Sequence, residues 1–100
     1  MNQMLKQAQK MKADMTTLQA DLEQREYTAT SGGGMVEVTV DGKHLIKSIK
    51  INPDAVDPDD IEMLEDLVTV AVNEAVTNAM KTAEEEMGAI TGGLNMPGLF

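Results

Sequence analysis

Histidine is the side chain with the widest use in catalysis, and this sequence has one, His44. The chain has no cysteine, so neither a Cys–His nucleophile nor a zinc–thiolate site is available. No serine is recognisably arranged beside His44 as a nucleophile, and the preceding Asp41 and Gly42 are typical of a hairpin turn. We therefore expect His44 to be an exposed turn residue, and we expect no catalytic residues.

Acidic residues are the second group whose types suggest chemistry, in this case a metal site. They gather between positions 54 and 66 as Asp54, Asp57, Asp59, Asp60, Glu62, Glu65 and Asp66. The run lacks the alternating ligands, the glycine and the twelfth-position glutamate of a calcium-binding EF-hand loop. We expect these acids to cap a helix and to form its solvated face, without a bound metal.

A glycine triplet, Gly32–Gly34, is the third candidate, because glycine-rich loops cradle phosphate groups. Such a loop leads into a helix and is followed by Gly-Lys-Ser or Gly-Lys-Thr. This triplet instead leads into an alternating valine-rich segment, which predicts a strand. The triplet therefore predicts a turn or hinge, and the sequence indicates no cofactor.

The positively charged residues are the fourth group. Their distribution along the chain decides whether the protein is suited to bind a nucleic acid. The net charge of −9 opposes phosphate binding. The acidity, however, is confined to residues 53–100, which hold one lysine against eleven acids. Three lysines, Lys6, Lys10 and Lys12, come before the first acid, Asp14. A second small group consists of Lys43, Lys47 and Lys50.

Residues 2–26 predict one long helix, because no glycine or proline interrupts them and apolar residues recur at spacings of four and three. This apolar seam consists of Met4, Ala8, Met11, Met15, Leu18 and Leu22. A helix of about 24 residues is roughly 36 Å long, and we expect its seam to pack on another helix, most simply from a second copy. Lys6 and Lys10 lie nearly opposite the seam. Their stripe is either a binding surface or an ordinary solvated face.

A short β region follows, with strands expected at about 27–31, 35–40 and 45–51. The middle strand alternates strictly, so that one face carries Val36, Val38 and Val40. The turn signal after it predicts that the second and third strands form a hairpin. The third strand alternates imperfectly and predicts Lys47 with Ile49 on one face and Ser48 with Lys50 on the other.

A second helix is expected at about 58–88, with Asp57 as its N-cap and Pro58 at its first position. Its apolar residues cover about half of the circumference, which predicts packing on the sheet. These elements make one domain over residues 1–90, followed by a Gly/Pro-rich tail at 91–100. No segment approaches the ~20 apolar residues of a membrane span and no signal peptide is recognised, so we expect a cytoplasmic protein.

The whole chain resembles the YbaB/EbfC family of small bacterial nucleoid-associated proteins. The resemblance rests on motifs in a fixed order: Met4-Leu5-Lys6-Gln7-Ala8-Gln9-Lys10-Met11, Gly32-Gly33-Gly34-Met35-Val36, Lys47-Ser48-Ile49-Lys50-Ile51, Val56-Asp57-Pro58-Asp59-Asp60-Ile61-Glu62-Met63-Leu64-Glu65-Asp66-Leu67, Asn73-Glu74-Ala75 and the closing Thr91-Gly92-Gly93-Leu94-Asn95-Met96-Pro97-Gly98-Leu99-Phe100. Each motif alone is unspecific, and their common order makes the resemblance specific.

The resemblance implies an α+β fold with an α-β-β-β-α protomer, a three-stranded antiparallel sheet and two long helices, in an intertwined homodimer. The helical arms of such dimers grip double-stranded DNA, and the family takes part in nucleoid organisation and in the regulation of gene expression. No enzymatic activity is associated with it. Applied to this chain, it makes Lys6, Lys10 and Lys12 the candidate phosphate contacts, with Lys43 and Lys50 as further candidates.

An alternative function uses the acidic second helix instead of the cationic first one. In this hypothesis Asp59, Asp60, Glu62, Glu65 and Asp66 dock on a basic surface of a replication, repair or transcription protein. Association with DNA is then indirect. The two hypotheses differ in whether purified protein binds DNA by itself.

Overall fold

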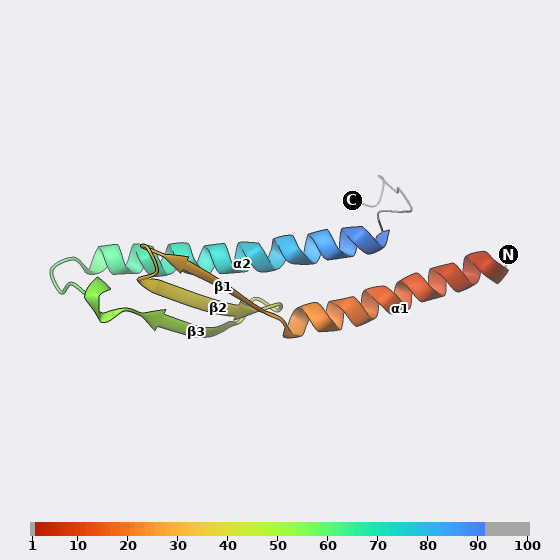
Figure 1. The fold of residues 1–100 in the computed structure, drawn as a ribbon, viewed down its shortest axis with the longest axis horizontal. Helices are drawn as coiled ribbons and strands as arrows, with labels where there is room; N and C mark the ends of the chain where they lie inside the picture. The colour runs from red at the N-terminus through yellow and green to blue at the C-terminus, as the bar shows by residue number, and fades with distance from the viewer. Residues whose placement is uncertain (1, 92–100) are drawn as a thin grey trace.

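The computed structural model describes residues 2–91, and their α-β-β-β-α order confirms the expected α+β class. The elements are α1 (Asn2–Gln24), β1 (Glu26–Ser31), β2 (Val36–Asp41), β3 (Ile46–Ile51), the short 3-10 helix η1 (Pro53–Ala55) and α2 (Ile61–Thr91). Figure 1 shows α2 lying along the sheet, and both long helices continuing beyond it toward the same end of the molecule. The result is an elongated protomer of 69 × 24 × 16 Å.

The core lies between α2 and one face of the antiparallel sheet, whose strand order is β1-β2-β3. The valines of β2 expected on one face are fully buried there, and they meet three buried alanines of α2. These residues are Val36, Val38, Val40, Ala71, Ala75 and Ala79. Because the alanines recur every four residues, they form a smooth helical track that lets α2 approach the sheet closely.

The glycine triplet forms the β1–β2 turn, as expected. All three glycines have positive φ values, +59°, +66° and +92°, a backbone region that residues with a Cβ rarely adopt. Next to the turn, the Ser31 hydroxyl donates a 2.6 Å hydrogen bond to the Leu67 carbonyl of α2. A Cβ on Gly32 would lie 2.9 Å from Leu67 Cδ2. The turn formed by the triplet therefore packs one end of the sheet against α2.

The β2–β3 pairing contains a register shift, which changes which residues of β3 share a face. Val38 pairs with Ile49 and Val40 pairs with Ile46, so Lys47 is left as the extra residue of a bulge. Strict alternation fails at this bulge, so the strand pairing does not test the expected grouping of Lys47 with Ile49. The face of β3 that continues the valine face carries Ile46, Ile49 and Ile51.

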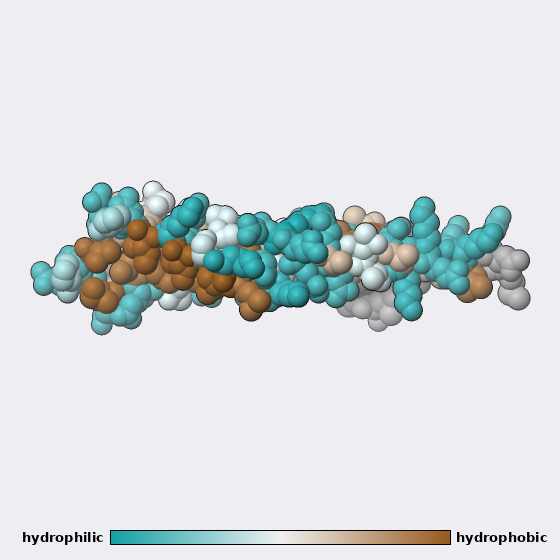
Figure 2. Space-filling model, turned by 90° about the horizontal axis from the view of Figure 1, so that it is seen from below, coloured by the Kyte–Doolittle hydropathy of each residue, from teal (hydrophilic) through white to brown (hydrophobic). Residues whose placement is uncertain are grey.

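These isoleucines lie on the α2 side of the sheet, yet α2 packs over β1 and β2 and leaves them exposed. Each of these residues is between 40% and 49% exposed to solvent. Figure 2, viewed from the β3 side, shows a hydrophobic area over the end of the molecule that contains the sheet. The edge strand thus carries an apolar surface that residues 2–91 do not cover.

The beginning of α2 is set by Asp60 rather than by the expected Asp57. Asp60 Oδ1 accepts a 3.2 Å hydrogen bond from the Met63 amide, the geometry of an N-cap. Asp57 Oδ1 instead accepts from the Asp59 amide at 2.9 Å and closes the preceding turn. The helix therefore starts three residues later than expected. It continues to Thr91, and the expected tail beyond that residue lies outside the described part of the chain.

The apolar seam of α1 is covered only near the sheet. Leu22 is buried, Leu18, Met15 and Met11 are half-buried, and Met4 is 75% exposed. The neighbour that covers the seam is the C-terminal half of α2, which lies beside α1. One helical partner of the seam therefore comes from the same chain.

The β2–β3 loop supports the end of α1 through Gly42. A Cβ at this position would lie 1.8 Å from the Leu22 carbonyl oxygen and 2.7 Å from the Glu23 Cα. Both atoms belong to the α1 backbone, so no side-chain rotation relieves the clash. Gly42 is therefore required for the close contact between the loop and α1.

Asp41 organises the same loop. Its Oδ1 accepts hydrogen bonds from the Lys43 amide at 2.8 Å and the Leu45 amide at 3.0 Å. The hydrogen bond from the Leu45 amide is the main cause that lowers the pKa of the Asp41 carboxyl below its ordinary value. Burial opposes this effect, and the Lys43 amide and the Lys47 charge add to it. His44 lies at the loop surface, as expected, with a left-handed φ of 67°.

Replacing Gly42 by alanine is expected to push α1 away from the loop and to lower the free energy of unfolding by about 1–3 kcal/mol. Urea unfolding measures the change. Gly88→Ala is the matched control, because Gly88 is exposed within α2 with no atom within 4 Å of a new Cβ. It is expected to stabilise by up to about 1 kcal/mol. Equal effects of the two substitutions would contradict the contact.

Asp41→Asn removes the charge of the loop carboxylate but keeps an acceptor oxygen. Because the folded-state pKa of Asp41 is lowered, its stabilising effect is present above the unfolded value of about 3.9 and is lost as the pH falls through the folded value. Urea unfolding should therefore show a less stable variant at neutral pH and a difference that narrows in acid. Asp54→Asn, at an exposed carboxylate, is the control. A difference that stays constant with pH would disprove this account.

Candidate nucleic-acid interface

Three exposed lysines of α1 form the cationic part of the candidate interface. Lys6 and Lys10 are one helical turn apart and share a face, while Lys12 lies roughly 120–160° around the helix from them. Within residues 2–91, none of the three forms an ion pair. Their charges are therefore available to a ligand. We call Lys6, Lys10 and Lys12 the arm lysines.

Lys6 and Lys10 point away from α2, whereas Lys12 lies beside the seam. At 100° per residue, the Lys6–Lys10 face is nearly opposite the seam, whose Leu18 and Leu22 lie toward α2. Figure 1 shows this half of α1 extending past the sheet. The helix therefore presents its cations at the end of the molecule farthest from the sheet.

Beyond Lys10 this face of α1 also carries acids, because Asp14 and Asp21 lie within roughly 60° of its centre. Positions at spacings of three and four after Lys10 are Ala13, Thr17, Ala20 and Gln24. Ala20 and Gln24 line a shallow depression together with Glu23 and with Asp41, Lys43, Leu45 and Lys47 of the β2–β3 hairpin. Lys10 and Ala20 are ten residues apart, or about 15 Å along the helix. Lys43 and Lys47 therefore lie at the base of the lysine-bearing face.

The structure separates the two hairpin lysines that the sequence analysis selected, Lys43 and Lys50. Lys43 is exposed beside the base of α1. Lys50 Nζ lies 3.8 Å from Glu37 Oε2 of β2, its cross-strand partner on the sheet face away from α2. Lys47 lies near Lys43 instead, with its Nζ 3.8 Å from Asp41 Oδ2. The sequence signals the bulge that places Lys47 there only through the imperfect alternation of β3.

The acidic residues do not converge on a metal site. In the described part of the chain, no group of three or more histidine, aspartate or glutamate side chains is placed to hold a metal ion. The acids at the start of α2 cap backbone amides, as Asp60 does, or are exposed, as Glu62, Glu65 and Asp66 are. Among residues 2–91, no helix has both the length and the apolar character needed to span a membrane.

Comparison with solved structures supports the fold. An uncharacterized protein from Helicobacter pylori superimposes with a TM-score of 0.66 at 21% identity. The match covers 85% of this chain and 89% of that one.

Comparison of sequences identifies the family. "Nucleoid-associated protein" is the name of relatives from Alkaliphilus metalliredigens, 53% identical, and Pelotomaculum thermopropionicum, 49% identical. Both matches cover all of this chain, with 88% of the first relative and 95% of the second. These names describe no enzyme. Residues 1–94 match the YbaB/EbfC DNA-binding family, and the chain therefore belongs to this family.

Proposed function

We propose that this protein is a nucleoid-associated DNA-binding protein that grips double-stranded DNA as a homodimer through phosphate contacts of α1. Its roles are the organisation of the nucleoid and the regulation of gene expression. The observation that carries the proposal is the set of unpaired, exposed arm lysines on a helix that projects beyond the sheet, in a member of a DNA-binding family.

Charge limits how such a protein meets DNA. Each protomer has a net charge of −9, and α2 carries many of the acids, so most of the surface repels phosphate. The arm lysines lie at the opposite end from the acidic start of α2, which reduces this repulsion where contact occurs. Binding through a few lysines is of modest affinity and falls steeply with salt, because each phosphate contact releases counterions.

The exposed apolar surface around β3 supports the homodimer. Ile46, Ile49 and Ile51 are on the α2 side of the sheet, where Val68, Val72 and Val76 of α2 are half-buried. The surface belongs to an edge strand, and the described part of the chain places no neighbouring strand beside its outer backbone groups. A second copy offers the same apolar surface and the same edge, which is the requirement for a twofold symmetric interface. The dimer then presents two sets of arm lysines.

The combined change Lys6→Gln and Lys10→Gln tests the DNA contact. Glutamine keeps the helix propensity and removes the charge. Four contacts per dimer are lost, so the slope of log K against log salt should become shallower by up to about 3.6. Fluorescence anisotropy of a labelled duplex across a salt series measures the slope.

Lys50→Gln is the matched control, because it removes a lysine that already faces Glu37. It is expected to leave the slope unchanged. DNA binding that is absent at ~50 mM salt, or that is equally affected by both variants, would overturn the proposal.

Ile49→Lys tests the dimer by placing a charge in the apolar surface of β3. Light scattering should give about 22 kDa for the parent protein, twice the 10.8 kDa of one chain, and a smaller mass for the variant. Val70→Lys is the control, since Val70 is 53% exposed on α2 and lies on the side of the helix away from β3. A parent protein that is monomeric at high concentration would contradict the interface.

The acidic adaptor remains a second candidate function, supported by the exposure of Glu62, Glu65 and Asp66 on one end of α2. In that case a basic protein binds α2 and DNA is reached indirectly. Charge reversal of these three acids to lysine would then abolish capture of the partner in the presence of nuclease. Loss of capture on nuclease treatment would instead favour DNA as the link.

A further inference from the structure

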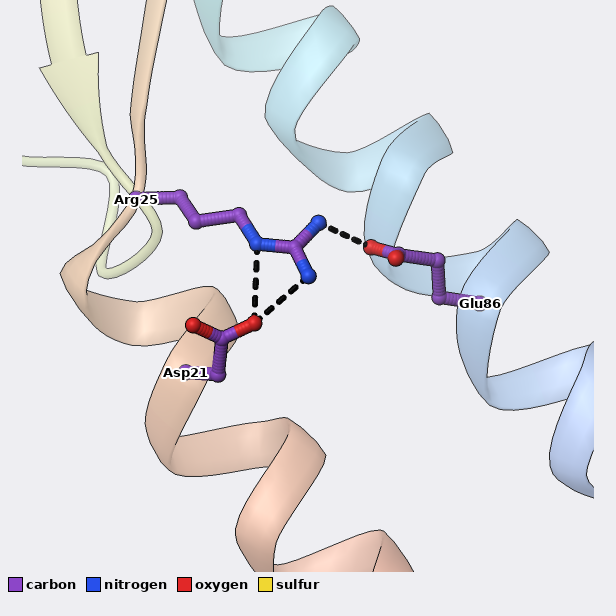
Figure 3. A network of polar contacts seen from close by, with 3 residues as sticks. All are labelled: Asp21, Arg25 and Glu86. Atoms are coloured by element: carbon purple, nitrogen blue, oxygen red, sulfur yellow. Dashed lines mark hydrogen bonds and ion pairs between the residues drawn. The ribbon is translucent and has the colours of Figure 1, made fainter.

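Arg25 is the single residue between α1, which ends at Gln24, and β1, which begins at Glu26. Its guanidinium contacts carboxylates on both long helices (Figure 3). Nε and Nη2 donate to Asp21 Oδ2 at 3.0 and 2.5 Å, and Nη1 donates to Glu86 Oε2 at 2.5 Å. The residue at the joint of α1 therefore bridges the last turn of α1 to α2. We call these three residues the Arg25 clasp.

The other contacts between α1 and α2 lie along the seam. Within residues 2–91 the seam is buried at Leu22, half-buried at Leu18, Met15 and Met11, and exposed at Met4. Gly42 supports the backbone at the end of the helix, at Leu22 and Glu23. The part of α1 before Met11, residues 3–10, is exposed, so a small change of the helix angle near Arg25 gives a large displacement of its far end.

We propose that Arg25 is a positioning residue whose clasp fixes the angle between α1 and α2. The planar guanidinium suits this role, because it donates to two carboxylates at once in a fixed geometry. Glu86 lies 61 positions away in the sequence, so the clasp joins elements that no local contact connects. Without it, α1 samples a wider range of directions while the sheet and α2 stay intact.

The clasp depends on ionic strength. The side chains of Arg25 and Glu86 are each 37% exposed, and that of Asp21 is 54% exposed. Dissolved ions screen charge pairs that are open to solvent. The hydrogen bonds to Asp21 and then to Glu86 raise the pKa of Arg25 above its ordinary value. Arg25 therefore stays charged, and salt weakens the clasp.

Distance measurements between spin labels test the proposal directly, because the chain has no cysteine. Labels at Ala13→Cys and Thr77→Cys report the angle between α1 and α2, and labels at Thr30→Cys and Thr77→Cys report the sheet–α2 unit. All three substituted side chains are exposed. Excess unlabelled chain suppresses distances between two copies.

Arg25→Gln and Glu86→Gln should each raise the population outside the main Ala13–Thr77 distance by a factor of about two to five, the size expected for an exposed ion pair. The Thr30–Thr77 distribution should not change. Glu85→Gln, which removes the neighbouring exposed acid, should change neither distribution. Raising salt from ~0.05 to ~0.5 M should broaden the first distribution in the parent protein and leave Arg25→Gln unaffected.

An Ala13–Thr77 distribution unaltered by both Arg25→Gln and Glu86→Gln would overturn the clasp. If Arg25→Gln also disturbs the Thr30–Thr77 pair, then Glu86→Gln, which leaves the joint residue in place, decides the question. These readouts do not depend on DNA.

One further experiment rests on the proposed function. Removing an acid strengthens the attraction to DNA, so Glu85→Gln should raise the affinity in anisotropy titrations. Glu86→Gln also removes an acid but breaks the clasp. It should bind DNA more weakly than Glu85→Gln, because its arm lysines are less well placed. Equal affinities of the two would contradict an effect of the clasp on the lysines. Absence of DNA binding in all variants would refute the proposed function alone, and the distance data would still judge the clasp.

Discussion

The close packing of α2 on two strands through alanines and valines is the constraint on which the rest of the structure depends. Small side chains on both sides, such as Ala75 and Val38, bring the helix axis near the sheet. The core is therefore thin, and α2 covers β1 and β2 while β3 stays open. The same helix is longer than the sheet, so its second half is free to lie beside α1. The packing of α2 on β1 and β2 thus leaves two features: the exposed apolar edge strand β3, and a second half of α2 that lies beside α1.

The sequence predicted the features that depend on local periodicity. The strict alternation of Val36, Val38 and Val40 identified the buried face of β2, and the interrupted alternation of β3 was the only sign of its bulge. Lys6 and Lys10 could be placed on one face because a helix has a fixed period. Lys43 and Lys47 could not be placed beside α1, because their position depends on contacts between segments distant in sequence.

The structure differs from the sequence-based expectations at two further places, because the chain offers two equivalent groups for the same role. Asp57 and Asp60 are both suitable N-caps in sequence, and the turn that uses Asp57 leaves Asp60 to begin α2. The seam of α1 required a helical neighbour, but its pattern did not distinguish a helix of the same chain from that of another. Arg25 was not selected at all, since its partner Glu86 becomes adjacent only after the chain folds.

The bulge at Lys47 has a consequence for growth by strand addition. An edge strand rich in isoleucine can recruit one strand after another and form fibres, unless something stops the addition. In β3, lysines interrupt the isoleucines at positions 47 and 50, and the bulge disturbs the regular spacing that an incoming strand would have to match. An apolar edge of this kind favours one closed pairing and disfavours open-ended polymerisation.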